Sequence, residues 1–113
     1  MEATVHTKYL RCSARKMRVI ADMIRNTPVD AAISQLFVLR KTKKSAVMVE
    51  KALKSAIANF KEKNADAGTE NLKVTSILVD GGPLIKRIRP RSQGRAFKIH
   101  KQLCHLKIAI SDS

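Results

Sequence analysis

Apolar residues recur with the period of an α-helix in the first half of the chain. The first such segment has apolar residues at i, i+3, i+4 and i+7, namely Met17, Ile20, Ala21 and Ile24. This spacing is typical of a helix with one buried face. Serine is a favoured residue at helix N-termini, so Ser13 and the pattern after it predict a helix that ends near Arg25.

Two further helices are predicted from the same period. Thr27 can cap the second helix, and Pro28 suits its first turn. Its core positions are Val29, Ala32, Ile33 and Leu36. The third helix covers about 43–63, and Glu50 and Lys54 form a favourable i,i+4 pair on it. Its predicted buried face consists of Ala46, Val49, Leu53, Ala56, Ile57 and Phe60.

The remaining regular segments have the alternating period of β-strands. Residues 3–11 alternate, with one face made of Ala3, Val5, Thr7 and Tyr9. A polar loop over 64–71 leads to a β-branched strand over 72–80, and a return strand covers about 95–111. The element order predicts an α+β fold. We expect a single domain, in which a small antiparallel sheet of about three strands packs with three helices.

A basic segment without acids connects the last two strands. Residues 81–111 contain no Asp or Glu. The segment is too charged to be buried, so we expect a long projecting β-hairpin over about 81–101, with the globular body over about 1–80 and 102–113. Two arms of about 10 residues at ~3.3 Å each would reach roughly 30 Å. Because an isolated two-stranded ribbon is marginally stable, we expect a large anionic partner to support it.

The overall charge favours the same class of partner. The chain has 23 Lys and Arg residues against 9 Asp and Glu residues, a net charge of +14. Nucleic acid is the leading partner for such a composition, ahead of an anionic membrane. The chain has no apolar run of the ~20 residues that a spanning helix needs, so we expect no membrane insertion. Residues 1–4 do not resemble a secretion signal, which favours an intracellular location.

Three separate basic sets favour a folded RNA over a DNA duplex, which is usually contacted by one recognition element. Aromatic residues are scarce, so we expect contacts with backbone and shape instead of stacked bases. The predicted RNA-binding residues before the hairpin are Arg11, Arg15, Lys16, Arg18, Arg40, Lys41, Lys43 and Lys44. Those in the hairpin are Lys86, Arg87, Arg89, Arg91, Arg95, Lys98 and Lys101.

Neither a metal site nor a catalytic site is predicted. His6, Cys12, Cys104 and His105 lack the short spacings of zinc ligands, and we interpret them as sheet histidines and buried thiols. A disulfide is not expected in a reducing compartment. We therefore expect no enzyme, metal or cofactor. Two alternatives to an rRNA-binding protein remain: a free-standing regulatory or nucleoid DNA-binding protein, and an RNA-processing enzyme that uses His6, His100 and His105.

Several motifs carry a family resemblance across nearly the whole chain. Lys86-x₄-Arg91-Ser92-Gln93-Gly94-Arg95 is followed, after nine residues, by His105-Leu106-Lys107-Ile108-Ala109-Ile110. Upstream, the chain contains Ser13-Ala14-Arg15-Lys16-Met17-Arg18, Ser55-Ala56-Ile57-Ala58-Asn59 and Val79-Asp80-x-Gly82-Pro83. Together these motifs resemble the bacterial-type ribosomal protein L22 family (uL22).

The resemblance implies a structural protein of the large ribosomal subunit. Such a protein binds 23S-type rRNA, supports subunit assembly, contacts neighbouring large-subunit proteins and is not a homo-oligomer. Its location would be the cytoplasmic ribosome, with an organellar ribosome as the alternative. The hairpin tip would line the exit tunnel and meet the nascent peptide. By matched position the tip comprises Ile85, Lys86, Arg87, Ile88, Arg89 and Pro90. Arg89 departs from the uncharged residue of many bacterial members.

Overall fold

The computed structural model describes residues 2–63, 71–90, 92–94 and 96–111. Most of the predicted polar loop over 64–71 lies outside these residues. Arg91 and Arg95 of the predicted RNA-binding set also lie outside them, as do the side chains of Arg89 and Lys98.

The three predicted helices are confirmed as α1 (Ala14–Ile24), α2 (Val29–Leu39) and α3 (Lys44–Lys63). The Oγ of Ser13 caps α1 by accepting a hydrogen bond from the backbone N–H of Lys16 at 3.4 Å. The predicted cap at Thr27 is wrong. Its hydroxyl instead donates to the carbonyl of Ile24 at 2.6 Å, so Thr27 closes the end of α1, and α2 begins without a side-chain cap.

The sheet is antiparallel and consists of β1 (Glu2–Leu10), β2 (Lys73–Pro90) and β3 (Ala96–Ser111) in the order β1-β3-β2. The C-terminal strand is therefore central, and its Ile108 lies opposite Val5 on one side and Ile77 on the other. The predicted α+β class with a three-stranded sheet is thus confirmed for the described residues. Placing β3 between strands that are distant in sequence ties the base of the hairpin to the N-terminus.

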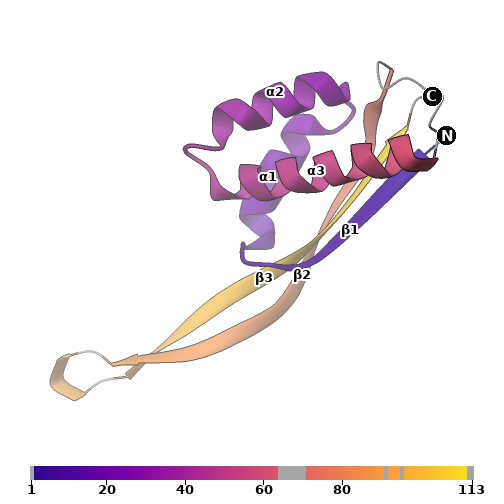
Figure 1. The fold of residues 1–113 in the computed structure, drawn as a ribbon. Coiled ribbons are helices and arrows are strands. Elements are labelled where there is room, and N and C mark those ends of the chain that lie inside the picture. The colour runs from indigo at the N-terminus through magenta and orange to yellow at the C-terminus, as the bar shows by residue number, and fades with distance from the viewer. Residues whose placement is uncertain (1, 64–70, 91, 95, 112–113) are drawn as a thin grey trace.

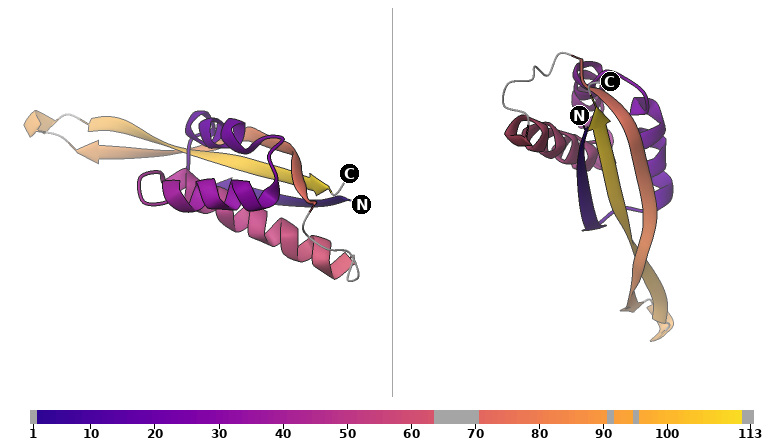
Figure 2. Two further views of the ribbon diagram at one scale, coloured as in Figure 1. Left: turned by 90° about the horizontal axis from the view of Figure 1, so that it is seen from above. Right: turned by 90° about the vertical axis from the view of Figure 1, so that its right-hand side faces the viewer.

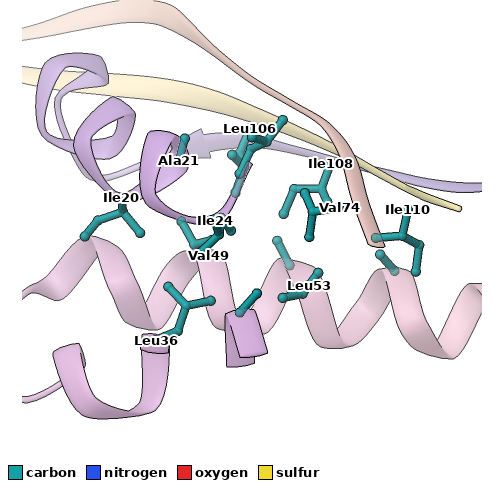
Figure 3. Packing of buried hydrophobic residues seen from close by; sticks show 14 of the residues in the cluster. Ile20, Ala21, Ile24, Leu36, Val49, Leu53, Val74, Leu106, Ile108 and Ile110 are labelled. Atoms are coloured by element: carbon teal, nitrogen blue, oxygen red, sulfur yellow. The ribbon is translucent and has the colours of Figure 1, made fainter. Parts of the chain in front are cut away.

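The helices form a layer against the body of this sheet (Figure 1). α1 and α3 contact the strands directly, while α2 packs on α3. Figure 3 shows Ile24, Val49, Leu53 and Val74 gathered between α3 and the strands. All the apolar positions predicted for α1 are buried. Those predicted for α2 and α3 are buried except Ile33 and Ile57, which are partly buried against the core.

Tyr9 departs from the alternation predicted for β1. Its side chain is 61% exposed and its φ is +61°, where the pairing register shifts between Thr7 and Leu10. The backbone N–H of Tyr9 donates to Nδ1 of His105 at 3.1 Å, and the two rings meet edge to face. A bulge of this kind turns one residue out of the pleat, so the two-residue period fails there.

β2 and β3 continue past the helical layer as a two-stranded ribbon (Figures 1 and 2). Pairing extends to Pro90 opposite Ala96, and the whole molecule measures 65 × 24 × 18 Å. At the root of the ribbon the strands approach so closely that a Cβ on Gly82 would lie 3.0 Å from the carbonyl oxygen of Leu103. A side chain at Gly82 would therefore press on the backbone of Leu103, which would have to shift by a few tenths of an ångström where the ribbon leaves the body.

Candidate RNA interface

The ribbon presents cations that have no acidic partner among the described residues. The side chains of Lys86, Arg87 and Lys101 are exposed. Nη1 of Arg87 donates to the carbonyl of Lys86, the adjacent residue in the chain, at 3.0 Å. The ion pairs found in the described part of the chain are on α1 and α3, at Arg25–Asp22 and Lys54–Glu50. The charge of the ribbon is thus left for an external anion to balance.

The segment Ile85–Pro90 lies on β2 beside the turn of the hairpin. The turn itself includes Ser92–Gly94, where Gln93 and Gly94 have φ values of +65° and +71°. The predicted tip residues therefore occupy the outer arm of the ribbon just before its end. Among them Ile88 is 70% exposed, so this arm presents an apolar side chain as well as cations.

Two of the three predicted basic sets, the N-terminal set and the α2–α3 loop, meet near the root of the ribbon in what we call the basic hollow. It has a volume of about 510 Å³ and lies between the β1–α1 turn and the α2–α3 loop. A second hollow of about 490 Å³ adjoins it and shares the β1–α1 turn. The residues lining the basic hollow are Arg11, Cys12, Ser13, Lys16, Val19, Thr42, Lys43, Lys44 and Ser45. The second hollow adds Arg15, Lys101 and Gln102.

The electrostatics of the basic hollow favour an anion. Neither lining contains an Asp or Glu among the described residues. Both α1 and α3 begin there, and neither has an acidic residue in its first turn. Helix N-termini carry partial positive charge, so placing Lys16 and Lys44 there is unfavourable until an anion compensates it.

The structure gives Arg18 an intramolecular role that its position off the apolar stripe did not predict. Its Nε and Nη2 donate to the carbonyl of Val79 at 3.3 and 3.2 Å. Arg25, the C-cap residue of α1 about two turns after Arg18, donates through Nη2 to the carbonyl of Ile77 at 3.0 Å. Because β2 is an edge strand, these arginines satisfy carbonyls that no neighbouring strand reaches. Arg18 therefore keeps only part of its hydrogen-bonding capacity for RNA.

We expect Arg18→Ala to lower the free energy of unfolding by about 1–2 kcal/mol, because a charged donor to a backbone carbonyl is lost. Arg15→Ala is the matched control, since Arg15 is exposed one turn earlier on α1. Urea unfolding of the two variants measures the difference. Equal stabilities for the two variants would show that the bonds to Val79 carry no net free energy.

The outer cations of the α2–α3 loop are arranged differently. The guanidinium of Arg40 lies 4.3 Å above the ring of Phe37 and so is held by a cation–π contact. Arg40 and Lys41 are exposed, but neither lines the basic hollow. Ser45 and Gln102 also line the hollows, although neither was predicted from the sequence. No local pattern marks them, because only the packing of α3 and β3 brings them to this place.

Of the four residues without zinc-ligand spacing, His6, Cys104 and His105 lie on strands, and Cys12 lies in the β1–α1 turn. The rings of His6 and His105 meet edge to face with centroids 6.5 Å apart. Cys12 and Cys104 are free thiols, and burial, followed by the nearby Cys12, raises the pKa of Cys104. Within the described ranges no three His, Cys, Asp or Glu residues are grouped as a metal site. Within those ranges, too, no helix combines the length and the apolar character that crossing a membrane requires.

Comparison with known proteins agrees with this arrangement. Residues 5–111 match the family described as "Ribosomal protein L22p/L17e". The protein named "Large ribosomal subunit protein uL22" from Caldicellulosiruptor saccharolyticus is 43% identical over 111 residues, which cover 98% of this chain and 88% of that protein. Both likenesses extend over the helical layer and the ribbon together. The chain therefore belongs to the L22p/L17e family of ribosomal proteins and is a uL22-type protein of the large ribosomal subunit.

Proposed function

We propose that the chain is a structural constituent that binds 23S-type rRNA on two surfaces and so supports assembly of the large subunit in the cytoplasm. The observation that carries this proposal is the projecting ribbon, whose described cations are exposed and have no acidic partner. Inserted between RNA segments, such a ribbon would neutralise phosphates on both sides and release their counterions. The partner would also provide the support that a free two-stranded ribbon lacks.

The body would hold the RNA from the root of the ribbon. The two adjoining hollows lie at one end of the helical layer. Their linings contain cations of the N-terminal basic set, cations of the α2–α3 loop, and Lys101 of the hairpin. A phosphate backbone that follows this end of the molecule would continue onto the ribbon (Figure 2). We assign the body to about 1–80 and 102–113 and the hairpin to about 81–101, acting as a single domain.

The outer arm of the ribbon would line the nascent-peptide tunnel. This role follows from the family resemblance and concerns Ile85–Pro90. The position of this segment beside the far turn of the ribbon supports it. Exposed Ile88 and the cations around it would then face the peptide and the RNA wall. Neighbouring large-subunit proteins would complete the contacts, and we propose no self-association and no catalytic role.

Sedimentation of a cell lysate at moderate salt tests this function. We expect the tagged full-length chain to migrate with large-subunit particles, because many phosphate contacts act together. Crosslinking in intact cells should then join it to 23S-type rRNA. A light fraction bound to duplex DNA would instead support the free-standing regulatory or nucleoid protein.

A further inference from the structure

We propose that the basic hollow contains a specific phosphate-binding site at the N-terminus of α3, centred on Ser45. The ligand chemistry is a phosphate group held by a hydroxyl, backbone amides and lysines. The source we favour is a phosphodiester of RNA, and in this respect the inference rests on the proposed function. The site itself is defined by three features of the described structure.

The first feature is the hydroxyl of Ser45. Ser45 is 5% exposed and lines the basic hollow, and its hydroxyl has no hydrogen-bond partner among the described residues. No fully buried side-chain oxygen of the described residues lacks a partner, so this hydroxyl oxygen is still reachable from the surface. A hydroxyl that is almost covered, yet still opens into a basic hollow, is placed to donate to an anion inside it.

The second feature is the open N-terminus of α3. Lys43 precedes this helix, and a lysine side chain has no acceptor with which to cap it. The nearby Thr42 hydroxyl donates to the carbonyl of Leu39 at 3.2 Å. The amides of Lys44 and Ser45 find no acceptor among the described residues. α1 differs, because Ser13 caps it. A phosphate oxygen would accept hydrogen bonds from the open amides of α3.

The third feature is the charge around this helix end. Arg11, Lys16, Lys43 and Lys44 line the same hollow, and α3 has no acid in its first turn. Lysines at the positive end of a helix repel it and one another. A bound phosphate would remove this repulsion. The combination of an unpartnered hydroxyl on a nearly buried residue, free amides and converging cations distinguishes this place from the solvated cations elsewhere on the surface.

Titration of the full-length protein with sodium phosphate, at constant ionic strength set with sodium chloride, tests the site. We expect saturable amide NMR shifts at Lys44–Ala46. Ser45→Ala should weaken the phosphate affinity about tenfold, since a hydroxyl bond to a charged group is lost. Alanine suits a helix at least as well, so the variant should fold. Ser55→Ala is the matched control, because Ser55 is exposed on the same helix.

The result that would overturn the site is an absence of saturable shifts at Lys44–Ala46, or an equal effect of the two serine variants. A second pair of variants tests whether the position of a lysine charge on α3 matters. Lys44→Gln should weaken phosphate binding, and Lys51→Gln should not, although both remove one exposed lysine from α3. Equal losses in this pair would show general charge attraction only and would also overturn the site.

Filter binding to purified 23S rRNA distinguishes the source of the phosphate. Ser45→Ala should weaken rRNA affinity several-fold, up to about tenfold, while Ser55→Ala leaves it unchanged. If phosphate binds at Ser45 but the rRNA affinity of Ser45→Ala equals that of wild type, the RNA source is overturned. If the wild-type chain does not bind 23S rRNA while phosphate still binds at Ser45, the proposed function fails and the site stands.

Discussion

Replacing Lys86, Arg87 and Lys101 together with glutamine is expected to weaken binding to 23S rRNA about a hundredfold at 0.15 M salt. The logarithm of the affinity falls linearly with the logarithm of the salt concentration, and each phosphate contact contributes about 0.7–0.9 to that slope. At this salt concentration the loss of one contact therefore lowers the affinity by a factor of roughly four to six. Three independent contacts multiply to about one hundred. The slope of log affinity against log salt should therefore fall by about 2–3, which filter binding over a salt series measures.

A variant with the same change in charge tests whether position matters. Lys51, Lys61 and Lys63 are exposed on α3, away from the ribbon, and their replacement by glutamine is the control. We expect it to reduce affinity and slope much less. Equal losses in the two triple variants would mean that the RNA responds to net charge alone, and the ribbon would lose its assigned role. Thermal unfolding of the ribbon variant should match wild type, because these cations have no described acidic partner.

Ile108→Ala is expected to lower the free energy of unfolding by about 2–5 kcal/mol. Ile108 is fully buried on the central strand (Figure 3). In the sheet register it lies opposite Val5 of β1 on one side and Ile77 of β2 on the other. Removing its side chain leaves a cavity at the point where three segments of the chain meet, and a tightly packed core closes such a cavity only in part. Equilibrium urea unfolding of the full-length protein measures the loss.

Leu78→Ala provides the comparison for that change. Leu78 lies on β2 next to Ile77 but on the other face of the strand, where it is 52% exposed. We expect its truncation to change stability by less than about 1 kcal/mol, because most surface substitutions have small effects. If the two variants were equally stable, the core would not lie on the side of the sheet that the helices cover.

The helices were predictable because their information is local. The apolar residues of α1 alone identify its buried face, and Ser13 marks its start. The long acid-free segment between two strands likewise indicated a projecting ribbon. The two-residue period failed at Tyr9, where a bulge and a bond to His105 turn the side chain outward. That bond joins residues far apart in the sequence, so no window of the chain contains it.

The sequence predicted the chemical character of the candidate site, but it did not predict which residues lie together in space. Residue types and net charge are properties of the chain itself, and they were sufficient to indicate an anionic partner, three basic sets and α+β elements. Only the tertiary structure brought Arg11, Lys44 and Lys101 to one end of the helical layer, assigned Arg18 to the edge of β2 and placed Ser45 in the lining of a basic hollow. The physical reason is that helix periodicity and charge act over a few residues, whereas these juxtapositions depend on how α1, α3 and the sheet share one core.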